Sequence, residues 1–516
     1  MANLLATKPL STILNEAHET GEYSLRRALG PNNLIALGIG AIIGTGIFVL
    51  AGTATAQYAG PAIILSFVLA AAGCVFAGLC YAEFASTIPV AGSAYTYGYA
   101  SLGEIFAWII GWDLVLEYAF GAATVATGWS GYLLSLLGDF GIKLPASLAG
   151  TRWDEFIYYH NHWEPVALIM PKLKEAGIDA ASLPHQFGVF NLFGFLAIVI
   201  ATLILVIGIR ESANFNTAIV YIKVCVLLVF VAIGGHFLLT HPELMKANWH
   251  PFIPPNTGVN GEYGWSGISR GAAVIFFAYI GFDAVSTAAQ EAKNPARDMP
   301  IGILGSLVIC TILYILVAGI LCGLVNYQYL NVRDALAVGI DKTGVGWGSL
   351  LVKVGALMGL SSTIVVMLLG QSRVFFSMSR DGLLPKMFNQ VHPRFRTPWI
   401  STLTVGLFVA GLAASLPINL LGDMVNIGTL LAFVIVCAGV WIVRRRDPNL
   451  QRPFKTPMVP LVPILGIVIS AYLMANLPLM TWIRLVVWLV IGLLIYFGYG
   501  RKHSRVQQSA AASTGA

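Results

Sequence analysis

The sequence is poor in charged residues. Asp, Glu, Lys and Arg make up 10% of its 516 residues, whereas hydrophobic residues make up 57%. Ordinary globular domains carry roughly 25% charged residues. A soluble core cannot bury so much apolar surface, so the composition excludes a soluble globular protein and places the excess in lipid.

The sequence also lacks the patterns of a barrel, a disulfide framework and a leader. Its apolar runs are continuous, which predicts spanning helices of about 20 residues and not the alternating strands of a barrel. The first 33 residues are polar and mixed in charge, so we expect no cleavable signal peptide. The six cysteines lie in apolar stretches without metal-ligand spacing and are interpreted as hydrophobic fillers: Cys74, Cys80, Cys225, Cys310, Cys322 and Cys437.

Long apolar windows predict an all-α membrane protein with twelve spans. The windows are 34–55, 62–87, 104–137, 188–208, 217–239, 266–289, 301–325, 347–375, 400–416, 419–442, 458–477 and 483–500. We divide the chain into an N-terminal tail (1–33), a first five-helix unit (34–239) with a long loop (139–187), a second five-helix unit (240–442), two further helices (443–500) and a C-terminal tail (501–516).

The basic residues are distributed unevenly over the predicted loops. Nineteen Lys and Arg fall on the side that carries both termini, against eight on the opposite side. The positive-inside rule therefore predicts a multi-pass protein of the cell membrane with both termini in the cytoplasm and the 139–187 loop outside. Topology and lipid contact account for the net charge of +6, which requires no nucleic acid.

Two spans carry glycine at mid-membrane, in the segments 38–48 and 276–283. Single glycine clusters are typical of close helix packing. These two lie five spans apart, and because five is odd, a second five-helix unit would insert upside down relative to the first. The second segment also ends in Asp283, which packing does not require. The pattern predicts an inverted repeat whose two interrupted helices meet at the bilayer centre.

An interrupted helix suits an amino acid zwitterion. The N-terminus of the second half offers N–H groups and a favourable dipole to a carboxylate, and the end of the first half offers carbonyl groups to an ammonium. We predict that the carboxylate meets Gly44, Thr45 and Gly46. The ammonium would meet the carbonyls of Ile42, Phe277, Ala278 and Ile280, and Phe277 is also the candidate aromatic gate, although most phenylalanines in such a chain are packing residues.

Lys223 lies inside the fifth span. Ionisable residues within spans are functional hypotheses by default, and burial disfavours the charged form of a lysine. If its amine contacts the unwound first span, binding and release of a proton there could be coupled to opening. The alternative is a lysine that extends to the interface.

Three further residues are candidates in the third and eighth spans. Glu117 and Asp113 are spaced i, i+4 and share a helix face. Glu117 could bind a substrate side chain or ammonium, or relay a proton, whereas Asp113 fits the wetted end of a long helix. Met358 could shape the side-chain pocket, although methionine more often serves as packing.

With these residues, the sequence resembles a bacterial member of the cationic amino acid transporter family, within the amino acid-polyamine-organocation superfamily. The motifs that carry the resemblance are 40–48, 89–97, 277–283 and 291–302, and it extends over about residues 25–500. It implies the leucine-transporter fold of five plus five inverted helices with two more at the C-terminus. It also implies the binding residues above and a proton-coupling role for Lys223 beside a vacant sodium site.

We therefore expect an importer of small neutral or cationic amino acids that works by alternating access, with the proton as coupling ion and no other cofactor. A uniporter or exchanger, with Lys223 structural, is the alternative. We find neither the repeated polar rings of a channel nor the side-chain constellation of an enzyme. His160 and His162 are weak evidence of a metal, and a small partner subunit is left open.

Overall fold

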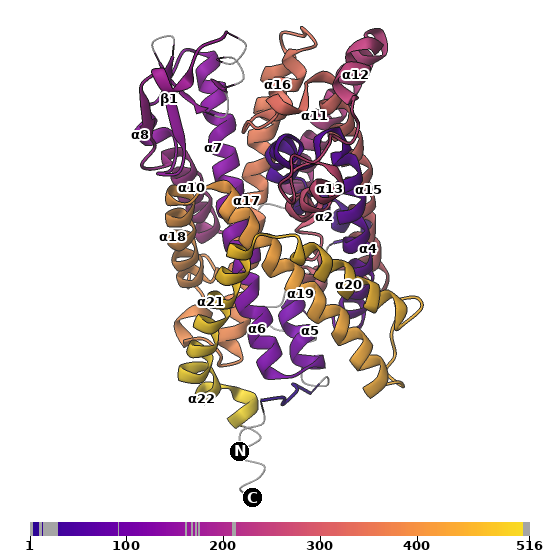
Figure 1. Ribbon diagram of the computed structural model, residues 1–516. Coiled ribbons are helices and arrows are strands. Elements are labelled where there is room, and N and C mark those ends of the chain that lie inside the picture. Colours follow the sequence, from indigo (N-terminus) through magenta and orange to yellow (C-terminus); the bar gives the residue numbers. More distant parts are fainter. Residues whose placement is uncertain are drawn as a thin grey trace, which may run out of the picture.

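The computed structural model describes residues 4–9, 13, 29–90, 92–159, 162–166, 169–170, 173, 176–208 and 213–508. These residues form a bundle of long helices with a small sheet at one end (Figure 1). Each predicted apolar window contains helix. The chain is thus a mostly helical membrane protein, as its composition predicts.

Eight helical stretches of the described chain are long and apolar enough to cross a membrane. They are Gly46–Thr87, Glu104–Asp139, Thr217–Thr240, Gly264–Thr287, Pro295–Leu324, Gly348–Arg380, Ile418–Arg446 and Leu479–His503. Four shorter apolar helices are also present: Pro31–Ile42, which shares the first predicted window with the first long stretch, and Leu192–Ile207, Trp399–Ser415 and Leu461–Ala475, which occupy other predicted windows. The first long stretch covers two windows, because the chain passes from one into the next through Gly60, whose positive φ of 59° suits glycine.

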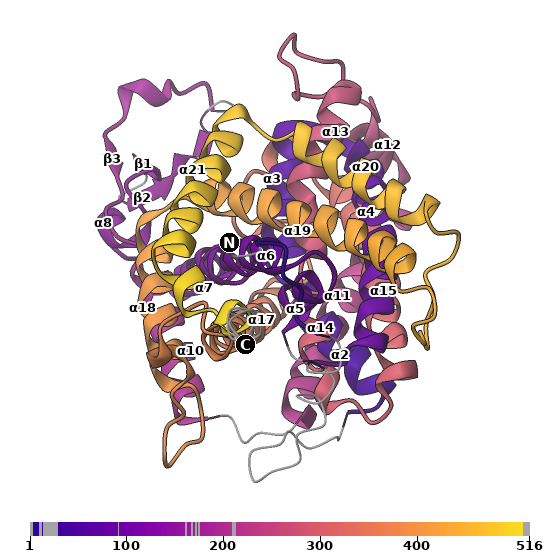
Figure 2. The same ribbon diagram turned by 90° about the horizontal axis from the view of Figure 1, so that it is seen from below.

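The main helices in chain order are α2 (Pro31–Ile42), α3 (Ala51–Ala54), α4 (Ile63–Thr87), α5 (Ser93–Ser101), α6 (Glu104–Val115), α7 (Gly121–Asp139), α8 (Ala146–Ala149), α10 (Leu192–Ile207), α11 (Ala213–Thr240), α12 (Pro242–Trp249), α13 (Gly264–Ile275), α14 (Ala284–Thr287), α15 (Pro295–Leu324), α16 (Ala335–Asp341), α17 (Gly348–Arg380), α18 (Trp399–Ser415), α19 (Ile418–Arg446), α20 (Leu461–Ala475), α21 (Leu479–Ile495) and α22 (Arg501–His503). Seen end-on, α6 lies near the middle and α10, α18 and α21 lie along one side (Figure 2).

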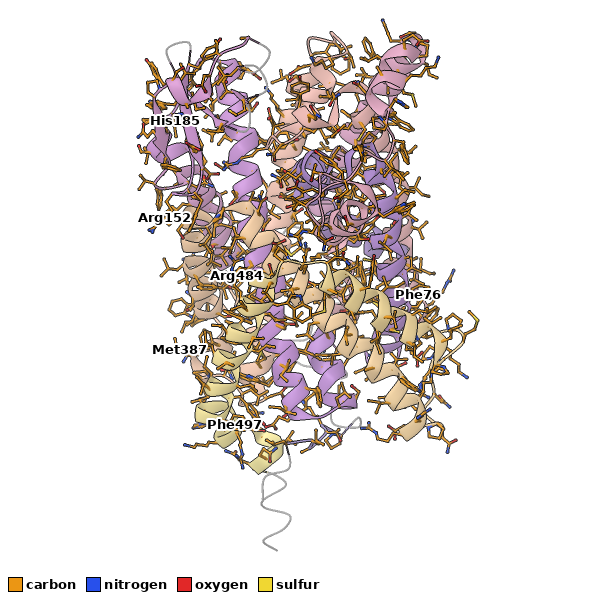
Figure 3. All side chains as sticks on the ribbon, viewed as in Figure 1. Phe76, Arg152, His185, Met387, Arg484 and Phe497 are labelled. Carbon is orange, nitrogen blue, oxygen red and sulfur yellow. The ribbon has the colours of Figure 1, made fainter. Side chains whose placement is uncertain are left out.

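The outer helices present apolar side chains outward. On α21, Val486, Val490 and Leu494 recur every four residues and are 56%, 50% and 69% exposed. Met387 and Phe497 likewise lie on the periphery (Figure 3). Contiguous exposed apolar surface of this kind is rare in soluble monomers, so these faces contact lipid.

The described terminal segments meet at the same end of the bundle. The backbone N–H of Lys8 donates to the carbonyl of Tyr99 (3.2 Å), and Glu104 accepts hydrogen bonds from Tyr496 (2.8 Å) and Ser504. The sheet lies at the opposite end (Figure 1). Which end faces the cytoplasm stays a prediction.

The long loop contains a sheet that the sequence did not predict. Its antiparallel strands lie in the order β2 (His162–Pro165), β1 (Glu155–Tyr159) and β3 (His185–Phe187). Arg333, which precedes α16, donates to Asp154 (2.5 Å) beside the sheet. Burial alone would raise the pKa of Asp154, but this guanidinium and the Thr151 backbone N–H hold it below its usual value. The ion pair therefore fastens the sheet to the bundle.

The predicted metal ligands of this loop stay untested. His160 lies outside the described residues, and the side chain of His162 does so as well. Within the described residues, no group of three or more His, Cys, Asp and Glu side chains is placed to hold a metal ion.

Candidate functional site

The first predicted span is interrupted at the glycine motif. Helix α2 ends at Ile42, and Ile43 takes an extended conformation with φ −72° and ψ 98°. A helix resumes with a π-helical turn, η1 (Gly46–Leu50), and continues through α3 and a second π-helical turn, η2 (Thr55–Ala59). The first N–H groups of a helix and its last carbonyls have no partner inside it, so the break leaves peptide groups of both kinds inside the bundle.

The sixth predicted span is interrupted in the same way. Helix α13 runs into a 3₁₀ turn, η6 (Phe276–Tyr279), and Ile280 is extended with ψ 134°. Gly281 has φ +115°, a conformation that L side chains rarely adopt. The chain then turns into the short helix α14. The glycine that the motif places here is therefore required by the backbone.

The two breaks pack directly against each other. A Cβ atom on Gly46 would overlap the Cα of Ala278, and one on Gly281 would lie 2.9 Å from the carbonyl oxygen of Ala41. Glycine at both positions lets the two backbones approach this closely. Gly128 of α7 packs against Thr45, whose buried hydroxyl has no hydrogen-bond partner. The third, first and sixth predicted spans thus converge at the breaks.

Lys223 caps the end of the first half-helix. Its Nζ donates to the carbonyl oxygens of Gly40 (2.6 Å) and Ile43 (2.9 Å) and to the hydroxyl of Ser362 (3.2 Å). The residue is fully buried. The hydroxyl of Thr363 lies 3.3 and 3.2 Å from the same two carbonyl oxygens and 3.2 Å from that of Gly359, and these acceptors share its single hydrogen. The fifth-span amine therefore touches the unwound first span instead of extending to the interface.

Two of the predicted backbone contacts have neighbours that the sequence did not reveal. The carbonyl of Ile42 accepts a hydrogen bond from the hydroxyl of Tyr314 (2.9 Å), so one of its two lone pairs is already used. A Cβ on Gly44 would lie 3.2 Å from the Cγ2 of Thr363, so helix α17 packs against this glycine, and the contact of its N–H group with a carboxylate stays a prediction. Tyr314 and Thr363 carried no signal in the sequence, because hydroxyl residues are common in apolar helices.

Three acids cluster beside the second break. Glu117 lies in a π-helical turn, η4 (Leu116–Phe120), which interrupts the third span next to Asp283. The carboxylate oxygens of Asp113 are buried and have no hydrogen-bond partner, whereas the carboxyl group of Glu117 is buried beside Asp283 and Thr429. Asp283 accepts a bond from Tyr118 (3.0 Å). Asp113 is 1% exposed and does not lie at a wetted helix end. Uncompensated buried carboxylates are costly, so the cluster suits a cationic group or bound protons.

Of the two remaining candidates, one lies at the breaks and one does not. Phe277 is 5% exposed and belongs to the second break, where its carbonyl accepts the N–H of Ile280 (3.2 Å). Met358 is not brought to the site. It is 37% exposed on the face of α17 that also carries Leu350 and Val354, since the face toward the breaks is formed by residues such as Thr363.

Interrupted helices that meet inside a membrane bundle define the class of secondary transporters. Comparison with known proteins gives the family. The amino acid permease model matches residues 29–498, and the chain belongs to this family, which comprises transporters and not enzymes.

Relatives of known name cover nearly the whole chain. It is 43% identical over 493 residues to the branched-chain amino acid permease BcaP of Bacillus subtilis (strain 168), over 95% of this chain and 97% of the relative. It is 40% identical over 504 residues to the methylthioribose transporter of the same organism, over 98% and 99%. Cationic amino acid transporter 4 of Homo sapiens is 29% identical over 606 residues, over 95% and 89%. The resemblance is confirmed for the superfamily, while the two bacterial relatives share more of the sequence than this cationic transporter does.

Proposed function

We propose that this permease carries amino acids across the cell membrane by alternating access and binds them where the two interrupted helices meet. The observation that carries the proposal is the direct packing of the breaks, with Gly46 against Ala278 and Gly281 against Ala41. This contact brings helix-end peptide groups of both polarities to one buried place. A zwitterion needs that combination, and a hydrophobic solute does not.

We propose a topology of twelve spans with both termini in the cytoplasm and a five-plus-five inverted repeat. The eight long helical stretches and four shorter apolar helices supply enough segments, and the interruptions fall in the first and sixth windows. The meeting of both described terminal segments at one end agrees with an even number of crossings. In this topology the sheet of the long loop is extracellular.

Proton symport is the proposed energy source, with Lys223 as the proton carrier. Its charged amine donates three hydrogen bonds, two of them to the carbonyls at the first break. A neutral amine has only two N–H groups and no charge to strengthen them. Loss of the proton would therefore weaken the cap and favour movement of the first half-helix. In the alternative, a uniporter or exchanger, Lys223 keeps its proton and acts only as a structural cap.

The proposed substrates are amino acids with small or branched apolar side chains, as the name of the relative with 43% identity suggests. Cationic amino acids are the second candidate, because the carboxyl groups of Glu117, Asp113 and Asp283 cluster in one buried place. Methylthioribose, named in another relative, lacks the zwitterion that the breaks suit.

Uptake by purified protein in proteoliposomes tests these proposals together. Labelled leucine, alanine, arginine and methylthioribose are each supplied with and without an inward proton gradient. We expect uptake of leucine or alanine to exceed that of arginine and methylthioribose and to rise with the gradient. Uptake that does not depend on the gradient would reject symport and leave the uniporter or exchanger. Uptake of methylthioribose alone would reject the amino acid proposal.

A further inference from the structure

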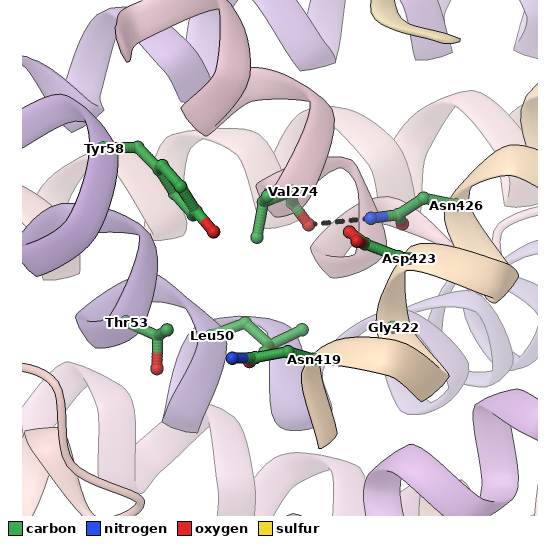
Figure 4. Close-up of a pocket in the computed structure, with 8 residues that line it drawn as sticks. All are labelled: Leu50, Thr53, Tyr58, Val274, Asn419, Gly422, Asp423 and Asn426. Atoms are coloured by element: carbon green, nitrogen blue, oxygen red, sulfur yellow. Dashed lines mark hydrogen bonds between the residues drawn. The ribbon is translucent and has the colours of Figure 1, made fainter. Parts of the chain in front are cut away.

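A polar cavity lies between the breaks and the sheet end of the bundle. It is lined by Leu50 and Thr53 of the first predicted span, by Tyr58 of η2, by Val274 of α13, and by Asp423 and Asn426 of α19 (Figure 4). Leu50 ends η1, and Val274 precedes η6 by two residues. The cavity therefore adjoins the site at the breaks from the side that the proposed topology makes extracellular.

The cavity is lined by groups that accept hydrogen bonds. Asn426 is 1% exposed, and its amide N–H groups donate hydrogen bonds to the carbonyls of Ala273 (2.9 Å) and Val274 (3.1 Å). Its carbonyl oxygen is buried and has no hydrogen-bond partner. The carboxylate of Asp423 lies one helical turn before it and lines the same space (Figure 4). Together they offer acceptors and a negative charge, which suit an ammonium group.

A cation stands directly beside these acceptors. The guanidinium of Arg270 on α13 lies 3.5 Å from Asp423, donates to the carbonyl of Asn476 (2.9 Å) and stacks over the ring of Tyr58 at 5.3 Å. An ion pair at 3.5 Å is longer than a strong charge-assisted hydrogen bond of about 2.7–2.9 Å. The pair therefore links α13 to α19 only weakly. Either charge can leave the pair and bind another group of opposite charge.

The cavity is narrow in this structure. Its free volume of about 20 Å³ holds about one water molecule, which is too little for an amino acid. Entry along this route therefore requires α13 and α19 to separate, and separation breaks the Arg270–Asp423 pair. Asp423 would then keep a hydrogen bond from Thr481 (3.3 Å) and the charge of Arg484 in its surroundings, and Arg270 would keep the carbonyl of Asn476. A zwitterion placed between the two mostly buried groups would offset the cost of breaking their pair.

We propose that Arg270 and Asp423 form an outer substrate subsite, in which Arg270 holds the carboxylate and Asp423, with the carbonyl oxygen of Asn426, holds the ammonium of an incoming amino acid. The zwitterion takes the place of the ion pair, and the pair forms again when the substrate moves on to the breaks. This inference rests on the proposed function, since it concerns the outer approach to the same site.

Half-saturation concentrations on the two faces test the subsite. Intact cells that lack other permeases report the outer face, and inside-out vesicles of the same cells report the inner face, with labelled leucine or alanine as the probe. We expect Arg270→Gln and Asp423→Asn each to raise the outer half-saturation concentration about tenfold, the scale of one lost charge-assisted hydrogen bond. The inner value should change much less.

Controls separate the subsite from a structural role. Arg270→Lys and Asp423→Glu keep the charge and should recover part of the outer affinity. Lys246→Gln removes a cation from an exposed pair on α12, near the sheet end (Figure 1), and should change neither face.

Equal shifts on both faces, or a lower maximal rate with an unchanged outer half-saturation concentration, would overturn the proposal. If the neutral variants fail to fold, the charge-conserving pair decides: outer values equal to the wild type on both variants would also overturn it. Absence of saturable leucine, alanine and arginine uptake by the wild type would instead reject the proposed function itself.

Discussion

Replacement of Lys223 by methionine removes the amine that caps the first break but keeps a long, flexible side chain. The amine donates to the carbonyls of Gly40 and Ile43 at 2.6 and 2.9 Å and to the hydroxyl of Ser362 at 3.2 Å. After the change, the two carbonyls keep only the hydroxyl of Thr363, which lies 3.3 and 3.2 Å away and has one hydrogen to share between them. The half-helix that ends at the break is then held less firmly.

The magnitude follows from the two short bonds. A hydrogen bond to a charged group contributes about 1.5–3 kcal/mol, so losing two of them at the lower limit costs about 3 kcal/mol. This corresponds to a factor on the order of 100 in the equilibrium between capped and uncapped states. Methionine also avoids the desolvation cost of a buried amine, so the overall thermal stability is a poor measure of the effect. The conformational equilibrium and the coupling to protons are the quantities to follow.

Accumulation of labelled substrate in proteoliposomes measures this effect. With an inward proton gradient, the wild type should concentrate substrate above the outside level. Lys223→Met should only equilibrate it, because no proton enters the cycle, while exchange across the membrane without a gradient should continue. Lys223→Arg keeps the charge permanently and should likewise fail to accumulate substrate.

The matched control is Lys353→Met. Lys353 is another buried lysine, 4% exposed, which pairs with Asp139 (2.6 Å) away from the breaks, and its loss should leave accumulation intact. If Lys223→Met still concentrates substrate in response to the gradient, Lys223 is not the proton carrier. If Lys353→Met abolishes accumulation equally, the effect is not specific to the break.

Three further predictions concern stability and packing. Gly46→Val should abolish folding or uptake, because the valine side chain would overlap the sixth span. The control Gly138→Ala has no atom within 4 Å of the new Cβ and should match the wild type in size-exclusion profile and uptake. Normal uptake by Gly46→Val would refute the packing of the breaks. Tyr314→Phe should destabilise the protein by about 1 kcal/mol through its lost hydrogen bond, measured by unfolding in detergent, and an unchanged midpoint would contradict this contribution. The pKa of Asp154 is lowered in the folded state, so its pair with Arg333 stabilises the fold at pH values above the unfolded pKa of about 3.9. This stabilisation is lost as the pH falls through the folded pKa. The difference in thermal midpoint between wild type and Asp154→Asn should therefore shrink below pH ~4, and a constant difference would argue against the ion pair.

The sequence predicted the breaks well because backbone geometry demands particular residues there. Gly46 and Gly281 have no alternative, since one contacts the opposing backbone and the other has a positive φ. Lys223 could be singled out for a similar reason, because a charge inside an apolar window has few physical explanations. Features that violate a general rule are therefore visible in a single sequence.

The orientation of side chains around a helix axis was not predictable. Helix α17 carries small or apolar residues on every face, so hydropathy could not show that Thr363 faces the breaks while Met358 is 37% exposed. Tyr314 and Thr363 could not be singled out either, because hydroxyl residues are common in apolar helices. The sheet escaped prediction because its strands are only three to five residues long, at the short end of the range over which an alternating pattern can be recognised.

The two halves of the first span are held by different partners, and this division bears on how the protein would alternate between its two open states. The half before the break, α2, is tied by Lys223 and Tyr314 through the carbonyls at its end. The other half is tied by Tyr132, whose hydroxyl donates to the carbonyl of Phe48 (2.9 Å), and by Tyr263, which donates to Ala56 (2.5 Å). A continuous helix would transmit any tilt from one end to the other. A break with separate attachments lets one half move while the other stays closed, which is the minimum that alternating access requires.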